Sequence, residues 1–284
     1  MRYRFANSEL LWQAKTLLLT EDNFSVLFTS VRNTDPDFFY YETAMPSDII
    51  KNARQIKYAG GYELFQTECG IFHMNHWAMC RYAFGFYIDD LDGDTPIYVN
   101  PEILNQQTMI ASHFLSTIGV HRKLLNRNCP ILHASYVVHD SEAILFLGAS
   151  GTGKSTQAQL WQDVLGAQII NGDRVLLECI GGKWTAHGYP CCGSSYICIN
   201  QSAPIKAIVL LQQAAENRVE VSSVAKNICA LTSATEIYPF ADAEVSKAFD
   251  LAQKITANIP ILTLRCTPDE RAVMALKDYL ENVL

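Results

Sequence analysis

The segment Gly148-Ala149-Ser150-Gly151-Thr152-Gly153-Lys154-Ser155-Thr156 decides how the rest of the chain is interpreted. It fits the pattern G-x-x-x-x-G-K-[ST] of a phosphate-binding loop. The apolar run at 143–147 precedes it and is typical of a buried strand. Residues 157–165 follow with good helix formers, whose apolar members recur at helical spacing. The sequence therefore predicts a strand, a glycine-rich loop and a helix in that order.

Such a loop binds phosphate through its backbone. Glycines let several N–H groups approach one phosphate, and the helix N-terminus adds partial positive charge. We expect Lys154 to reach the β- and γ-phosphates of ATP and the Ser155 hydroxyl to ligate Mg²⁺. The alternative is a glycine- and serine-rich turn that only mimics the motif. The predicted ATP-binding residues are Gly148, Ala149, Ser150, Gly151, Thr152, Gly153, Lys154, Ser155 and Thr156.

A second chemical signal lies just past the predicted helix. Residues 167–177 have apolar strand character on both sides of one acidic residue, Asp173. A phosphate-loop enzyme needs a carboxylate near its Mg²⁺, because this hard cation prefers oxygen ligands. We therefore predict that Asp173 and Ser155 hold the metal. The alternative is that Asp173 is only a turn residue, since Asn-Gly-Asp is also a hairpin-type signal.

These residues carry a resemblance to a known family. It rests on Leu132-His133-Ala134, on the 148–156 loop and on Ile170-Asn171-Gly172-Asp173-Arg174-Val175. From about residue 132 onward, the chain resembles HPr kinase/phosphorylase and its relatives of the phosphoenolpyruvate carboxykinase-like fold. Residues 150–156 also look like the kinase loop of ATP-dependent phosphoenolpyruvate carboxykinase. The resemblance implies a mixed α/β P-loop domain that uses ATP and Mg²⁺ to phosphorylate a serine-type hydroxyl.

One departure from the family leaves the general base open. HPr kinases have Asp-Asp-Arg where this chain has Gly172-Asp173-Arg174, so one carboxylate is missing. The base is then either Asp173 or His133, which matches the family's strand histidine; histidine suits proton transfer because its pKa lies near neutrality. A buried structural histidine is the alternative for His133. We expect Arg174 to stabilise the transition state or to pair with Asp173, and the glycine-bounded 188–195 loop to face the acceptor.

The chain is expected to fold as two domains. Residues 1–127 are predicted to form a smaller β-rich domain that ends in a helix, and 128–284 the catalytic P-loop domain. Asn100 as N-cap and Pro101 at the first helical position predict that this helix runs from 100 to about 118. Hairpin turns are expected at 60–61, 68–70 and 89–94. The strands expected in a small antiparallel sheet are 24–31, 38–42, 55–58, 62–67, 71–76 and 81–88.

The C-terminal domain is expected to alternate strands and helices. The polar residues 126–128 separate it from the first domain, and Thr267-Pro268-Asp269-Glu270 is a capping box that opens the last helix. Two further helices are expected at 225–233 and 242–256. The strands expected besides those around the loop are 131–139, 184–187, 205–211, 219–224 and 261–266.

The composition and net charge exclude some classes of binding partner. The 284 residues include 22 Lys and Arg against 29 Asp and Glu, a net charge of −7. We therefore expect no nucleic-acid partner and no binding to anionic membranes. The N-terminus has no apolar core of signal-peptide length, and no apolar run in the sequence approaches the length of a membrane span. The nine cysteines form no C-x-x-C pair, which favours reduced thiols and a cytoplasmic protein. A homo-oligomer is implied only by the family resemblance.

Three functions are compatible with these features. The first is a kinase that acts on a serine-type hydroxyl of a protein, a peptide or free serine. The second is phosphoenolpyruvate carboxykinase activity on oxaloacetate, which the short chain and the lack of a clear basic cluster upstream of the loop disfavour. The third is a regulatory module that binds a nucleotide without turnover, which the missing second carboxylate favours.

Overall fold

The computed structural model describes residues 1–32, 34–59, 61–77, 80–88, 93–100, 102 and 108–282. The chain divides into two compact units, Met1–Lys123 and Leu124–Leu284. The division lies within helix α2 (Val120–Asn126). Strands and helices both occur in the described residues, so the protein is of the mixed α/β class.

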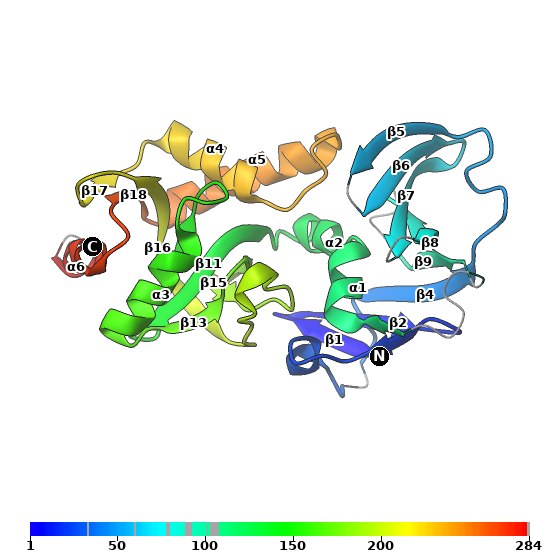
Figure 1. Ribbon diagram of the computed structural model, residues 1–284, viewed down its shortest axis with the longest axis horizontal. Coiled ribbons are helices and arrows are strands. Elements are labelled where there is room, and N and C mark those ends of the chain that lie inside the picture. The colour runs from blue at the N-terminus through cyan, green and yellow to red at the C-terminus, as the bar shows by residue number, and fades with distance from the viewer. Residues whose placement is uncertain are drawn as a thin grey trace. The chain divides into compact units, whose positions relative to one another are not determined.

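The first unit is built on one eight-stranded sheet. Its strand order is β1-β2-β4-β9-β8-β7-β6-β5, and the β2–β4 and β4–β9 pairs are parallel. The sheet is therefore mixed and larger than the small antiparallel sheet that the sequence predicted (Figure 1). Its strands are β1 (Arg2–Phe5), β2 (Ser8–Gln13), β4 (Phe38–Ala44), β5 (Arg54–Ala59), β6 (Tyr62–Thr67), β7 (Gly70–Trp77), β8 (Cys80–Tyr87) and β9 (Thr95–Val99).

A helix packs on this sheet through aromatic side chains. In α1 (Ala111–Thr117), the ring of Phe114 lies 4.8 Å from that of Trp12 and 5.8 Å from that of Phe84. The two short strands β3 (Leu18–Thr20) and β10 (Thr108–Ile110) pair with each other in parallel, separately from the main sheet.

Two predictions for this unit were wrong, and Asp22 makes hydrogen bonds at both places. The expected strand at 24–31 contains the 3₁₀ helix η1 (Ser25–Phe28), because the Asp22 carboxylate accepts hydrogen bonds from the N–H groups of Phe24 and Ser25, each at 2.8 Å. Of the helix expected from 100 to about 118, residues 108–110 instead form β10, and α1 begins at Ala111. There the same carboxylate accepts from the Ser112 hydroxyl at 2.5 Å. The expected helix start at 101–107 and the turns at 60–61 and 89–94 fall wholly or partly outside the described residues.

The second unit contains the other large sheet. Its order is β12-β11-β14-β15-β16-β18-β17, with β13 paired to β11. A further β12–β16 pairing closes the path from β12 through β11, β14, β15 and β16 on itself. The strands are β11 (Ile131–His139), β12 (Glu142–Leu147), β13 (Gln168–Asn171), β14 (Arg174–Ile180), β15 (Lys183–His187), β16 (Ser202–Gln213), β17 (Arg218–Val221) and β18 (Ile261–Cys266).

Helices cover the parallel strands β12, β16 and β18 on both faces (Figure 1). The helices α4 (Val224–Ala234) and α5 (Asp242–Asn258) pack on the face that carries Leu145 and Leu147. The helices α3 (Lys154–Leu165) and α6 (Glu270–Asn282) pack on the face that carries Ile144 and Phe146. The alternation along β12 thus divides its side chains between two cores. Continuous apolar runs are typical of parallel strands that are buried on both faces.

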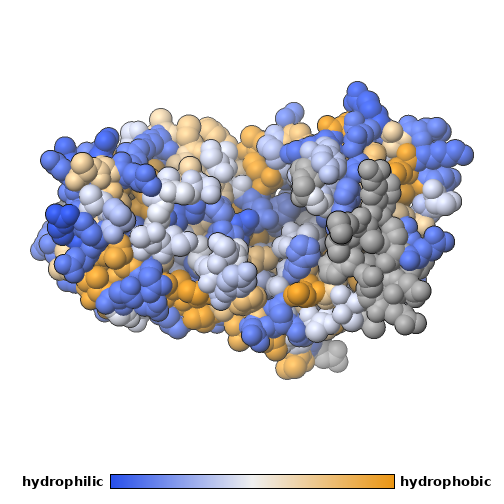
Figure 2. Space-filling model, in the orientation of Figure 1, coloured by the Kyte–Doolittle hydropathy of each residue, from blue (hydrophilic) through white to orange (hydrophobic). Residues whose placement is uncertain are grey.

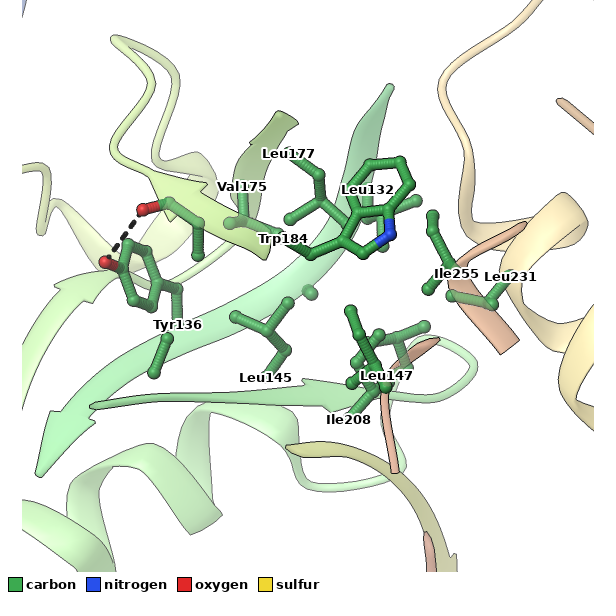
Figure 3. Close-up of a cluster of buried hydrophobic side chains, with 14 of the residues drawn as sticks. Leu132, Tyr136, Leu145, Leu147, Val175, Leu177, Trp184, Ile208, Leu231 and Ile255 are labelled. Carbon is green, nitrogen blue, oxygen red and sulfur yellow. Dashed lines mark hydrogen bonds between the residues drawn. The ribbon is translucent and has the colours of Figure 1, made fainter. Parts of the chain in front are cut away.

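Figure 3 shows the first of these cores, with Trp184 among Leu132, Leu177 and Leu231. The Tyr136 hydroxyl at the edge of this core donates to the Ala186 carbonyl at 3.2 Å. The visible surface in Figure 2 is mainly hydrophilic with scattered apolar patches. No helix within the described ranges is both long and apolar enough to cross a membrane.

Candidate functional site

The 148–156 loop connects the end of β12 to the start of α3 at the carboxyl edge of the parallel strands. Gly151 and Gly153 have φ angles of +80° and +103°, which favour glycine. At Gly148, a Cβ atom would lie 2.5 Å from the Thr152 Oγ1 atom, so the loop folds back too closely for a side chain there. The order of strand, glycine-rich loop and helix agrees with the sequence. In α/β proteins, ligands ordinarily bind at the carboxyl ends of the parallel strands.

The Lys154 side chain lies against its own loop. Its exposed fraction is 8%, and its Nζ atom donates to the carbonyls of Gly148 at 3.0 Å and Ala149 at 3.4 Å. Burial lowers the pKa of Lys154, while the nearby Asp173 carboxylate opposes this shift. The ammonium is therefore at the beginning of the loop, within electrostatic reach of Asp173.

The structure brings together the three other residues that the sequence predicted as catalytic. His133 lies on β11, and Arg174 pairs with it in register at the start of β14. The Oδ1 atom of Asp173 is 3.2 Å from His133 Nδ1. The Arg174 guanidinium contacts both Asp173 Oδ2 and His133 Nδ1. A histidine, a carboxylate and a guanidinium thus form one connected cluster.

The surroundings of His133 favour its neutral form. Burial lowers the pKa of His133; Asp173 raises it, and the positive charges of Arg174 and Lys154 lower it further. The imidazole side chain still exposes 40% of its surface. A neutral, accessible imidazole can accept a proton, which a buried structural histidine could not do from its position in a core.

Glu236 completes the cluster, and no sequence pattern pointed to it. Its Oε2 atom lies 3.0 Å from Arg174 Nε. The residue follows α4, and its N–H donates to the Ile131 carbonyl at 2.8 Å, which fixes it beside β11. Although burial lowers the pKa of Arg174, the carboxylates of Glu236 and Asp173 raise it overall. Arg174 is held between two carboxylates, far apart in sequence.

Asn171 positions this cluster and was also missed as a functional residue. Its side chain is fully buried and makes four hydrogen bonds. The Oδ1 atom accepts from the N–H groups of Asp173 and Arg174, both at 2.9 Å. The Nδ2 atom donates to the carbonyls of Tyr189 at 2.8 Å and Cys191 at 3.1 Å. One amide therefore ties the Asp173 turn to the 188–195 loop.

The 188–195 loop lies directly beside Asp173. A Cβ atom on Gly193 would come within 2.8 Å of Asp173 Cγ, and Gly193 has a φ angle of +54°. Glycine is needed here both for the backbone conformation and for the close approach. Whether this loop faces an acceptor stays a prediction.

The donor set fits a magnesium ion that also binds phosphate. Ser155 is exposed in the first turn of α3, and Asp173 is partly exposed. No cluster of three or more His, Cys, Asp or Glu side chains that could hold a metal occurs within the described residues. Mg²⁺ commonly uses one or two protein oxygens and completes its shell with substrate phosphates and water. Ser155 and Asp173 are suited to that kind of site.

Two cavities contact different residues of the loop. We call the first, of about 440 Å³, the histidine-side cavity; it is lined by His133, Leu147, Gly148, Ala149, Ser150, Leu210, Leu211, Gln212, Lys226, Ala230, Ser233 and Ala234. The second, of about 410 Å³, is the glutamine-side cavity; it is lined by Gly151, Thr152, Gly153, Thr156, Gln157, Gln213, Ala214, Cys266 and Pro268.

Comparison with known proteins assigns this chain to a family. The structure of the Hpr(Ser) kinase/phosphatase from Coxiella burnetii is similar at 12% identity and a TM-score of 0.29, over 53% of this chain and 92% of that one. A superposition this loose transfers no residue roles. No curated protein matches the sequence. The model of a family described as SynChlorMet cassette protein ScmC matches residues 100–271, which is more than half of the chain. The chain therefore belongs to the ScmC family of SynChlorMet cassette proteins.

Proposed function

We propose that this protein is an ATP-dependent kinase with a phosphoenolpyruvate carboxykinase-like P-loop domain. It transfers the γ-phosphoryl group to a serine-type hydroxyl of a protein, a peptide or a small molecule. The observation that carries the proposal is the cluster of His133, Asp173 and Arg174 within electrostatic reach of Lys154. A glycine-rich turn that only resembled the motif would have no reason to be accompanied by these groups.

In this proposal the loop positions the phosphates. The N–H groups of residues 149–154 surround them, and Lys154 turns from the Gly148 and Ala149 carbonyls to the β- and γ-phosphates. Mg²⁺ held by Ser155 and Asp173 would neutralise the charge that develops on the phosphoryl oxygens. Arg174 adds positive charge at the same place. Positioning and electrostatics suffice because phosphoryl transfer needs little covalent chemistry from the protein.

His133 serves as the general base. Asp173 is engaged by Arg174 and by the proposed metal. Arg174 also contacts His133, but through Nδ1, and the imidazole side chain still exposes 40% of its surface. The proton passes from the acceptor hydroxyl to a ring nitrogen of His133 while the oxygen attacks the γ-phosphorus, and the bond from this phosphorus to the β–γ bridging oxygen breaks to release ADP. Asp173 then stabilises the imidazolium that forms, since its Oδ1 atom is 3.2 Å from Nδ1.

Carboxykinase chemistry has less support. Oxaloacetate carries two carboxylates, which a site must neutralise or pair. Among the described residues that line the histidine-side cavity, Lys226 is the one lysine or arginine, and its Nζ atom donates to Thr263 Oγ1 at 2.8 Å. This lining favours an acceptor with less charge than a dicarboxylate.

Phosphoryl transfer can be detected directly by mass spectrometry. Purified protein with ATP and Mg²⁺ is incubated with free serine, a serine-containing peptide pool and an HPr-like carrier protein. We expect one acceptor class to gain the mass of a single phosphate, and EDTA to abolish the gain. Binding of ATP without transfer to any hydroxyl acceptor would instead support the regulatory module.

The role of His133 predicts a pH dependence. Its pKa lies below the ordinary 6.5, so the base stays neutral at neutral pH and becomes protonated only on acidification. The transfer rate should be flat near pH 7–8 and fall about tenfold per pH unit below a midpoint under 6.5. The His133→Gln variant should transfer the phosphoryl group more slowly, and its pH–rate profile should lack the acidic limb. An unchanged limb in that variant would identify another base.

A further inference from the structure

The histidine-side cavity extends along one face of α4. Four residues of this helix line the cavity at the spacing of a single helical face: Lys226, Ala230, Ser233 and Ala234. The C-terminal end of α4 lies beside β11, because the N–H group of Glu236 donates to the Ile131 carbonyl at 2.8 Å. The cavity therefore leads from Lys226, in the first turn of α4, toward β11 and His133, which also lines it.

One end of this cavity is the reacting end under the proposed function. Gly148, Ala149 and Ser150 line it there, at the start of the loop. The Lys154 ammonium lies on the carbonyls of Gly148 and Ala149, and this lysine contacts the γ-phosphate in such loops. The acceptor hydroxyl has to reach this end of the cavity, because it attacks the γ-phosphorus.

Lys226 lies at the other end, and its ammonium is only partly used. Its Nζ atom donates to Oγ1 of the buried Thr263 at 2.8 Å. An ammonium has three N–H donors, and in the described part of the chain the Lys226 side chain makes no other hydrogen bond and no ion pair. The residue is half-buried, and the first turn of α4 contains no acidic side chain, although the helix dipole disfavours a cation there. A carboxylate bound at Lys226 would compensate this charge.

The strand register gives the distance between the two ends. Leu147, the last residue of β12, pairs with Leu210 of β16, and Leu210 pairs with Thr263 of β18. Neighbouring strands lie about 4.8 Å apart, so the ammonium on Thr263 is roughly 10 Å from the start of the loop. Leu147 and Leu210 line the cavity between these ends, and none of its described lining residues is an Asp or Glu.

This distance decides which acceptors can contact both ends. In free serine the hydroxyl and the carboxylate are on neighbouring carbons, which is too close. An extended peptide advances about 3.3 Å per residue, so an acidic side chain about three residues from a serine would reach Lys226 while the serine lies at the loop. Leu147, Leu210 and Ala230 would contact the residues between them. The cavity volume of about 440 Å³ is in the range of ligand sites.

We propose that the acceptor is an extended peptide segment, in which an Asp or Glu about three residues from the phosphorylated serine pairs with Lys226. The inference rests on the proposed kinase function and narrows its acceptors to one class. Lys226 selects the serine that reaches the loop and takes no part in the chemistry. As in the proposed function, the serine hydroxyl loses its proton to His133, its oxygen bonds to the γ-phosphorus, and ADP leaves.

The test compares three synthetic peptides with blocked termini and a single serine. One has Glu three positions before the serine, one has Glu three positions after it, and the reference has Gln at both positions. We expect one of the Glu peptides to exceed the reference about tenfold in kcat/KM, mainly through a lower KM. In Lys226→Met this ratio should fall to about one. Lys247→Met is the matched control, since Lys247 is half-buried on α5 and outside the cavity, and it should keep the wild-type ratio.

Charge reversal gives a result that a misfolded variant could not imitate. Lys226→Glu should disfavour the Glu peptide and prefer a peptide with Lys at the same position, about tenfold in kcat/KM. Glutamate in the first turn of α4 is favoured by the helix dipole, so we expect this variant to fold. Loss of activity on the Glu peptide with no gain on the Lys peptide would contradict the pairing.

Failure of this inference can be told apart from failure of the proposed function. If wild type phosphorylates the Glu and Gln peptides equally well, the kinase function stands and the inference is wrong. The same holds if free serine gains a phosphate and no peptide does. If Lys226→Met slows all three peptides by one factor, Lys226 acts on the phosphate donor and the inference is again wrong. If no hydroxyl acceptor gains a phosphate, the proposed function fails and the inference fails with it.

Discussion

Lys154→Met is expected to slow ATP turnover by about 10²–10³-fold, the usual effect of removing one preorganised group that stabilises transition-state charge. Among the described residues, the ammonium donates to the loop carbonyls of Gly148 and Ala149 and to no acidic side chain. These contacts can be exchanged for phosphate oxygens without breaking an ion pair. Methionine keeps the length of the stem and removes the charge.

The measurement is the steady-state release of ADP with the acceptor that mass spectrometry identifies. Lys183→Met is the matched control, because Lys183 is exposed on β15 in the same unit and outside both cavities. The control should turn over as wild type does. Thermal unfolding of Lys154→Met checks that the slower turnover does not come from a loss of stability when the buried side-chain stem is replaced. Full turnover in Lys154→Met would refute the assignment of the loop as the ATP site.

The loop and its flanking elements were predictable because their signals are local. The apolar run of β12, the glycines with positive φ and the helix formers of α3 all lie within one stretch of sequence. The helix starts at Lys154, earlier than the helix formers at 157–165 alone indicate, since the loop residues Lys154, Ser155 and Thr156 themselves form its first turn. Short-range sequence patterns were therefore sufficient to predict this part of the fold.

The candidate site was predictable only in part. The family resemblance pointed to His133, Asp173 and Arg174, and the strand register of β11 against β14 brings them together. Glu236 and Asn171 could not be found in the same way. Glu236 reaches Arg174 across 62 positions of sequence, and Asn171 acts through backbone groups of a distant loop. Partners defined by tertiary contacts leave no mark on local periodicity.

The N-terminal unit shows the same limit. At both places the Asp22 carboxylate accepts hydrogen bonds, locally in η1 and, at a separation of 90 residues, in the first turn of α1. The apolar residues at 24–31 fit a strand pattern, but side-chain hydrogen bonds to the backbone favoured a turn. The parallel β2–β4 and β4–β9 pairs likewise depend on long connections that alternation patterns do not encode.

The Asp173→Asn variant is expected to transfer the phosphoryl group about 10²–10³-fold more slowly. The substitution removes the negative charge of one proposed metal ligand, and it removes the carboxylate that faces His133. Asparagine has nearly the same shape, so the turn held by Asn171 should persist. The loss of a carboxylate that raises the pKa of His133 should also move the acidic limb of the pH–rate profile to lower pH. Single-turnover transfer measured against pH and Mg²⁺ concentration reports both effects.

Glu236→Gln is the matched control, since Glu236 contacts the same Arg174 guanidinium from the other side at 3.0 Å. Both variants remove one carboxylate from Arg174, but only Asp173 also faces His133 at 3.2 Å. If Asp173 acts on the metal and the base, Glu236→Gln should retain the rate within about tenfold and keep the Mg²⁺ dependence of wild type. Equal losses in the two variants would mean that both carboxylates serve only to hold Arg174, and the metal-binding role of Asp173 would be wrong.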